Sequence, residues 1–145
     1  MLASRSNQVR LKKNEKEILL KYKTIAVVGA SPDPQRHSNA VMAYLIGTGY
    51  KVIPINPNAE TVLGRKSYTD LGAVPETIDI VDVFRAPDKV MPTVDEAIAV
   101  GAKVLWFQEG VINEEAAERA RQAGLIVVMD KCIARAHAAL TGAKH

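Results

Sequence analysis

Short apolar runs rich in β-branched residues alternate along this chain with longer segments in which apolar residues recur at helical spacing. Such runs are typical of buried parallel strands. Five of them predict strands, at residues 24–29, 51–55, 78–84, 103–107 and 125–129. Pro54 in the second run predicts an edge or terminal position, because proline cannot donate a hydrogen bond to a neighbouring strand.

The segments between the strands predict helices. Their expected ranges are 7–22, 38–47, 88–100, 113–123 and 130–140. Asn113 and Asp130 are the expected N-caps of the last two helices, and Gly124 is the expected C-cap of the fourth. Pro92 can be accommodated only in a first turn. This alternation predicts an α/β fold, a Rossmann-like doubly wound five-stranded parallel sheet with helices on both faces.

The length of 145 residues fits one domain. We expect an N-terminal helix over residues 1–23 that packs on the domain, the domain itself over 24–141, and a tail over 142–145. The N-terminal segment is polar and charged, unlike a secretory signal. With a single cysteine, Cys132, no internal disulfide is possible, which fits a reducing compartment. We therefore expect a cytoplasmic protein.

The charge balance excludes some partners. The net charge is +3, and no dense block of Lys and Arg interleaves with aromatic residues, so we expect no nucleic-acid partner. No apolar run is long enough for a membrane span, so we expect no membrane association. A mild positive excess suits a small anionic ligand.

The loop Gly29 to Asn39 carries the strongest candidate chemistry. It follows the first buried strand and opens a helix, and ligands of doubly wound sheets sit at the carboxyl ends of strands. Gly29 permits a tight turn, the helix N-terminus offers free N–H groups, and Ser31, Arg36 and Ser38 add polar contacts. These features predict a phosphate-binding loop. The alternative is an empty loop in which Ser38 only caps the helix.

The loop departs from two well-known phosphate-binding motifs. It has neither G-x-G-x-x-G nor the G-K-[ST] of a P-loop. An NAD site usually has Asp or Glu after the second strand, where this chain has Asn56 and Pro57. Arg65 and Lys66 follow further on. The pattern favours a nucleotide with an extra phosphate, and NADP and coenzyme A both qualify on charge.

Several segments of the chain together carry a resemblance to a known family. The segments that carry it are Ile25–Ser31, Arg36 with Ser38, Val52–Pro57, Gly64, Asp82–Arg85, Leu105–Gln108 with Gly110, and Met129–Cys132. Together they resemble the small CoA-binding proteins, a family similar to the N-terminal CoA-binding domain of the succinyl-CoA synthetase α subunit. The resemblance covers about Lys23 to Leu140. It implies coenzyme A or an acyl-CoA as the small-molecule ligand, and it names no protein partner.

The resemblance also implies which residues bind the ligand. They follow four of the strands: Gly29, Ala30, Ser31, Arg36 and Ser38; Asn56 and Pro57; Phe84, Arg85, Ala86 and Pro87; and Gln108, Glu109 and Gly110. The first set would face the nucleotide and pyrophosphate, the second the adenosine side, and the last the pantetheine. The final loop departs from its relatives at Lys131 and Ile133, where they often have Arg and Pro.

Several of these side chains have a competing structural interpretation. Trp106 and Phe84 are expected mainly in the core, whereas Arg85 and Gln108 are expected mainly to serve binding. His37 suits a phosphate contact or a solvated loop equally, and His137 is expected to be structural or exposed.

No catalytic arrangement emerges from the sequence. It contains no Ser-His-Asp ordering, metal-spaced cluster or paired carboxylates. We therefore expect a stand-alone CoA-binding protein and no enzyme. Cys132 is expected at a helix N-terminus, where a thiolate is stabilised, so a mixed disulfide with CoA is one hypothesis and a buried, inert thiol the other.

Two alternative functions stay open. One is an NADP- or NAD-binding domain of oxidoreductase type, which the missing glycines disfavour. The other is a nucleic-acid or protein interaction through the basic N-terminal helix, whose Glu15 and Glu17 favour a solvated face instead.

Overall fold

A computed structural model describes residues 12–142 of the chain. Its centre is a five-stranded parallel sheet in the order β2-β1-β5-β6-β7. The strands are β1 (Thr24–Val28), β2 (Lys51–Ile55), β5 (Ile80–Val83), β6 (Val104–Phe107) and β7 (Ile126–Val128). All five predicted strands are thus confirmed, with no end shifted by more than two residues. Strand β2 lies at one edge, as Pro54 predicts.

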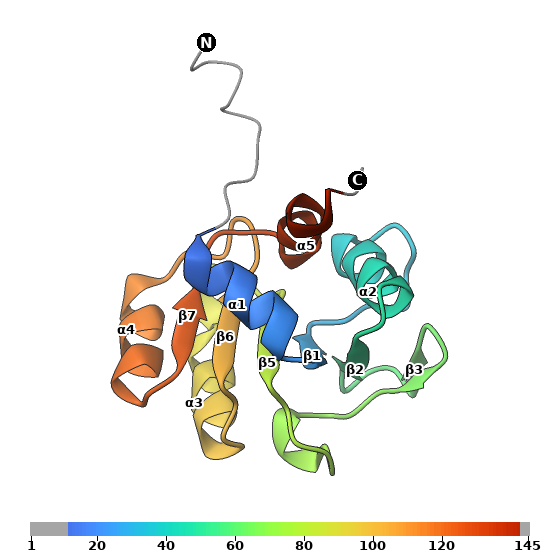
Figure 1. Ribbon diagram of the computed structural model, residues 1–145. Coiled ribbons are helices and arrows are strands. Elements are labelled where there is room, and N and C mark those ends of the chain that lie inside the picture. The colour runs from blue at the N-terminus through green and yellow to red at the C-terminus, as the bar shows by residue number, and fades with distance from the viewer. Residues whose placement is uncertain (1–11, 143–145) are drawn as a thin grey trace.

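Helices cover both faces of the sheet, which confirms the Rossmann-like fold class (Figure 1). The helices are α1 (Lys13–Lys21), α2 (His37–Gly47), α3 (Met91–Ala99), α4 (Glu114–Gln122) and α5 (Ile133–Thr141). Helices α1, α2 and α5 pack on one face, and α3 and α4 pack on the other. Two apolar layers result, one on each side of the sheet.

The two layers follow from alternation along each strand. In β1, Ile25 and Val27 point into the layer beneath α2 and α5, whereas Ala26 and Val28 point towards α3 and α4. Because both faces are covered, each central strand reads as a continuous apolar run. Asp82 of β5 is the exception, a fully buried carboxyl group within such a run.

Helix α1 extends this core. Ile18 and Leu19 are buried in the layer beneath α2 and α5, and the Tyr50 hydroxyl donates to the Leu19 carbonyl at 2.6 Å. The start of the predicted helix, residues 7–11, and most of the predicted tail, residues 143–145, lie outside the described residues. Over residues 12–142, no helix combines the length and apolarity that crossing a membrane requires.

Two sequence expectations about helix starts are wrong. The predicted cap Asp130 lies two residues before the actual N-cap Cys132, and it has φ +61 with Oδ1 accepting from Gly110 N at 2.8 Å. The segment 88–100 is not one helix: a 3-10 turn, η3 (Pro87–Lys89), precedes α3. Asn113 does cap α4, with its Oδ1 accepting from Ala116 N.

The short elements between β2 and β5 were not predicted from the sequence. They are a hairpin of β3 (Thr61–Val62) and β4 (Arg65–Lys66), followed by the 3-10 turn η2 (Leu71–Ala73). Each is too short for a periodic pattern to develop.

Candidate functional site

Strand order places a topological switch point between β1 and β5. The chain leaves β1 towards α2 on one face and leaves β5 towards α3 on the other. The two loops therefore diverge and open a crevice at the carboxyl ends of these strands. A cavity of about 610 Å³ lies there, within the size range of ligand sites.

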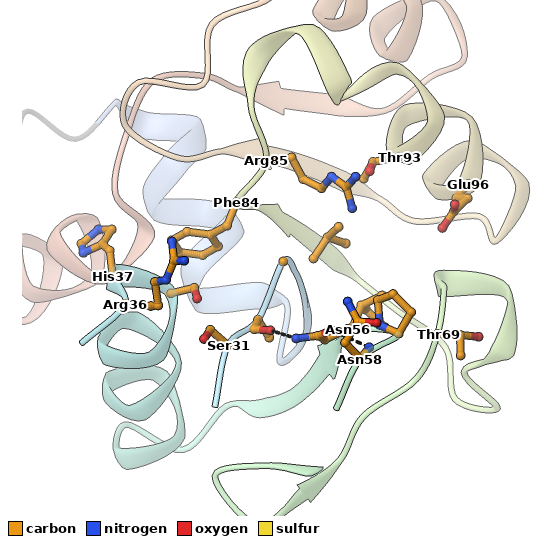
Figure 2. Close-up of a pocket in the computed structure, with 16 residues that line it drawn as sticks. Ser31, Arg36, His37, Asn56, Asn58, Thr69, Phe84, Arg85, Thr93 and Glu96 are labelled. Atoms are coloured by element: carbon orange, nitrogen blue, oxygen red, sulfur yellow. Dashed lines mark hydrogen bonds between the residues drawn. The ribbon is translucent and has the colours of Figure 1, made fainter. Parts of the chain in front are cut away.

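Residues from the loops after β1, β2 and β5 converge on this cavity, and Figure 2 shows their side chains around it. The lining consists of Val28, Gly29, Ala30, Ser31, Arg36, His37, Ser38, Ile55, Asn56, Pro57, Asn58, Thr69, Phe84, Arg85, Thr93 and Glu96. Nine of the fourteen sequence-predicted site residues are among them: Gly29, Ala30, Ser31, Arg36, Ser38, Asn56, Pro57, Phe84 and Arg85.

Gly29 lets the two diverging loops meet. Its φ is +88, and a Cβ at this position would overlap the carbonyl group of Phe84. Its own N–H donates to the Ile55 carbonyl at 3.1 Å. Only glycine tolerates both the backbone conformation and the close approach. The floor of the cavity is therefore backbone, which a ligand can approach closely.

The N-terminus of α2 opens onto the cavity without a side-chain cap. Arg36 is its N-cap residue and makes no side-chain capping bond, and the first turn holds no acidic residue. Ser38 is buried inside the first turn, so the interpretation of Ser38 as the cap is wrong. An uncapped N-terminus presents N–H groups and partial positive charge, which together favour an anion.

Hydrogen bonds hold the loop around this N-terminus. Asn39 Nδ2 donates to the Ser31 carbonyl at 2.9 Å, and Ser31 Oγ accepts from Asp33 N at 3.1 Å. Asn56 Nδ2 donates to the Ala30 carbonyl at 2.8 Å. The loop is thus preorganised by its own side chains, a condition that lowers the cost of binding.

Asn56 links the loops after β1 and β2. Besides its bond to Ala30, its Oδ1 accepts from Asn58 N at 2.8 Å (Figure 2). Both ends of the amide are engaged within the protein. The lining residues directly after β2 are Asn56, Pro57 and Asn58, so this strand end offers no carboxylate to a ribose.

Phe84 and Arg85 form the opposite wall. Phe84 is half-buried, packs on the core and meets the His37 ring edge-on at 5.9 Å between centroids. Arg85 is exposed, and Figure 2 shows it near Thr93. The two arginines of the lining, Arg36 and Arg85, lie on different walls, so positive charge flanks the cavity from two sides.

Five predicted site residues do not line this cavity: Ala86, Pro87, Gln108, Glu109 and Gly110. Several of them have structural partners instead. The Pro87 carbonyl accepts from Asn113 Nδ2, Glu109 pairs with Arg135 at 3.1 Å, and Gly110 N donates to Asp130. Contact of these five residues with a ligand stays a prediction.

Structural interpretations hold for other candidates. Trp106 is fully buried and its Nε1 donates to the Lys131 carbonyl. His137 Nδ1 lies 2.9 Å from the Tyr44 hydroxyl, and burial lowers the pKa of His137, with the Lys23 charge adding to the effect. Lys131, a departure from the family pattern, pairs with buried Glu15 of α1 at 2.7 Å, so the last loop fastens this helix.

Arg65 and Lys66 do not join the cavity. They form β4 and line a separate hollow with Lys51 and Glu76. The extra positive charge inferred from them is therefore not at this site.

Lining residues from two further segments carry no signal in the sequence. Thr69 follows the short hairpin, whereas Thr93 and Glu96 come from the first turns of α3. Glu96 Oε1 accepts from Leu71 N at 3.2 Å and so ties α3 to η2. These segments lie close to the cavity because of how the connection between β2 and β5 folds, and no sequence motif predicts that fold.

The fold and the cavity define a Rossmann-like α/β protein with a cleft at its switch point. Residues 23–138 match the family model of the CoA binding domain. The chain belongs to this CoA-binding domain family, and the expected resemblance is confirmed.

Three known proteins are similar to the chain in sequence or structure. It is 42% identical over 123 residues to the uncharacterized protein YneT of Bacillus subtilis (strain 168), covering 85% of this chain and 91% of YneT. It is 27% identical over 122 residues to an ADP-forming acetate–CoA ligase I of Archaeoglobus fulgidus, covering 77% of this chain but 18% of the ligase. A hypothetical protein from Pyrococcus horikoshii OT3 has a similar structure, with a TM-score of 0.89, 46% identity and coverage of 94% and 99%.

Proposed function

We propose that this protein binds coenzyme A or an acyl-CoA in the cavity between β1 and β5. The observation that carries the proposal is the uncapped N-terminus of α2, which opens onto that cavity beside Arg36. Helix N-termini at switch points bind phosphate groups. Membership of the CoA-binding domain family favours CoA among phosphate-bearing ligands.

In this proposal the phosphates and the two ends of CoA have separate surroundings. The pyrophosphate lies on the backbone of Gly29 to Ser31 and on the first turn of α2, with Arg36 beside it. The adenosine lies towards Asn56 and Pro57. The pantetheine passes Phe84 towards the loop from Gln108 to Gly110.

An NADP- or NAD-binding domain of oxidoreductase type is the competing function. NAD sites commonly hold the ribose with an acidic residue at the end of the second strand. At this place the amide of Asn56 already serves Ala30 and Asn58. This arrangement disfavours the dinucleotides.

The proposal concerns binding alone. The name of the Archaeoglobus relative describes a ligase, but this chain corresponds to 18% of its length. We therefore extend no ligase chemistry to this chain. The proposed role is that of a stand-alone binding protein in the cytoplasm, as expected from the sequence.

Calorimetric titration with CoA, acetyl-CoA, NADP and NAD tests the proposal. We expect CoA or acetyl-CoA to bind, and both dinucleotides to bind more weakly or not at all. The proposal is overturned if NADP binds and neither CoA nor acetyl-CoA does.

Replacing Arg36 should weaken CoA binding. The substitution Arg36→Ala removes a charge-assisted hydrogen bond to phosphate, at a cost of about 1.5–3 kcal/mol in binding free energy. The matched control is Arg119→Ala, because Arg119 is an exposed arginine paired with Asp95 between α4 and α3. Calorimetry should give the control the affinity of the unaltered protein. Equal affinities for Arg36→Ala and the control would remove Arg36 from the site.

A further inference from the structure

We propose that Cys132 is a disulfide-exchange site, at which the protein forms a mixed disulfide with the thiol end of its ligand. The inference rests on the proposed CoA function. The co-reactant is CoA disulfide, the oxidised form of the ligand.

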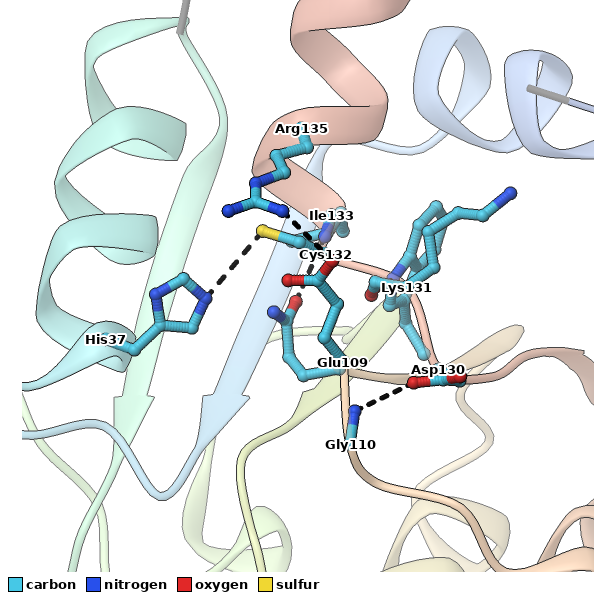
Figure 3. A network of polar contacts seen from close by, with 10 residues as sticks. His37, Glu109, Gly110, Asp130, Lys131, Cys132, Ile133 and Arg135 are labelled. Atoms are coloured by element: carbon cyan, nitrogen blue, oxygen red, sulfur yellow. Dashed lines mark hydrogen bonds and ion pairs between the residues drawn. The ribbon is translucent and has the colours of Figure 1, made fainter. Parts of the chain in front are cut away.

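Three side chains from separate strand ends meet at this place. Figure 3 shows His37 after β1, Glu109 after β6 and Cys132 after β7. One ligand atom from each lies within 4.8 Å of the others, and Cys132 Sγ is 3.9 Å from His37 Nε2. Cys132 is also the N-cap residue of the nine-residue helix α5. The thiol thus has an imidazole nearby and lies at the partially positive end of a helix.

Gln108 gives an independent indication that a ligand reaches this place. Its side chain is 2% exposed, and its Nε2 has no hydrogen-bond partner among residues 12–142. Its Oε1 accepts from Ile133 N at 3.0 Å, so the amide lies at the N-terminus of α5, beside Cys132. A buried donor without an acceptor is rare in a folded protein. An acceptor atom of a ligand would satisfy it.

His37 connects the thiol to the CoA cavity. Its imidazole lines that cavity and packs edge-on against Phe84, while its Nε2 lies near the sulfur. A pantetheine arm that passes Phe84 towards the loop from Gln108 to Gly110 would end beside Cys132. Because Cys132 is 1% exposed, the exchange requires the side chains around it to move before the ligand reaches the sulfur.

The same cluster suits a thiolate better than a metal cation. Glu109 is already paired with the Arg135 guanidinium at 3.1 Å. The N-termini of α2 and α5 both lie at the cluster, since His37 begins α2 and Cys132 caps α5. Their partial positive charges repel a cation and stabilise an anion.

The exchange step conserves electrons. His37 Nε2 takes the thiol proton, and the Cys132 thiolate attacks one sulfur of CoA disulfide. A bond forms between Sγ and that sulfur as the original disulfide bond breaks. The released CoA thiolate carries away the electron pair and takes a proton from water.

Mass spectrometry of the intact protein incubated with CoA disulfide tests the proposal. We expect one CoA per chain, removed by dithiothreitol and located on Cys132 by peptide mapping. Binding raises the local concentration of disulfide, so the rate should exceed that with glutathione disulfide at equal concentration by about tenfold or more. Excess desulfo-CoA, which lacks the thiol, should suppress this advantage. Cys132→Ser should give no adduct, and Arg119→Ala should react like the unaltered protein.

The outcomes separate this inference from the proposed function. If calorimetry detects CoA binding but no adduct forms, the exchange site is wrong and CoA binding stands. Equal rates with both disulfides also overturn the exchange site. If CoA and acetyl-CoA both fail to bind, the proposed function fails. Peptide mapping uses the unaltered protein, so the test does not depend on the folding of Cys132→Ser.

Discussion

Gly29→Ala should lower both the stability of the protein and its affinity for CoA. Alanine at φ +88 is strained, and its Cβ would overlap the Phe84 carbonyl. Together the strain and the overlap should cost about 2–4 kcal/mol of unfolding free energy. Relief of the overlap moves the loop after β1 away from β5 and widens the proposed phosphate site. Urea unfolding and calorimetry measure the two effects.

Gly124→Ala is the matched control for the backbone term. Gly124 has φ +94, similar to Gly29, but a Cβ there has no neighbour within 4 Å. It follows α4, whose residues are absent from the cavity lining. We expect a loss of about 1 kcal/mol from strain alone and unchanged CoA affinity. Equal losses for the two variants would show that contact with Phe84 does not constrain the loop.

The strands were predictable because burial on both faces makes each one a continuous apolar run. Helix starts were predictable where a capping side chain marks them, as Asn113 does for α4. Asp130 has the same chemistry but is bonded to Gly110, a residue 20 positions away. Local sequence cannot distinguish a cap from such a distant contact.

The candidate site also contains some residues that the sequence predicts and others that it does not. Gly29 and Asn56 follow strands directly and Arg36 begins the helix after β1, so the predicted order of strands and helices already placed them at one edge of the sheet. Glu96 and Thr69 reach the cavity through η2 and the short hairpin. Arg65, close to Asn56 in sequence, is directed to another hollow by the same hairpin. Distance along the sequence therefore did not predict which residues line the cavity where the connection between β2 and β5 folds back on itself.

Asp82 is a carboxyl group in apolar surroundings, and its burial should make stability depend on pH. It is fully buried in β5, and neither carboxyl oxygen has a hydrogen-bond partner in the described part of the chain. Burial raises the pKa of Asp82 well above its ordinary value of 3.8. In the folded protein the group therefore keeps its proton to a higher pH than in the unfolded chain. Because the unfolded state binds fewer protons in this window, stability falls as the pH rises through it.

Asp82→Asn should consequently stabilise the protein at neutral pH. Asparagine has nearly the same shape but cannot ionise, so the variant avoids a charge penalty that can reach several kcal/mol for an unpaired buried group. Below the ordinary pKa of 3.8, both states of the unaltered protein are protonated and the pH-dependent gain vanishes. Above it, the gain in unfolding free energy should grow by about 1.4 kcal/mol per pH unit until the folded-state pKa is passed.

Urea unfolding of the two proteins from pH 4 to pH 8 gives the difference curve directly. Contributions from all other titrating groups cancel in that difference, so its slope reports on residue 82 alone. Asp95→Asn, which removes an exposed carboxylate paired with Arg119, should change stability by about 1 kcal/mol or less. A flat difference curve for Asp82→Asn would mean that the folded protein ionises Asp82 as readily as the unfolded chain. The carboxyl group would then have to be hydrated or paired inside the sheet layer.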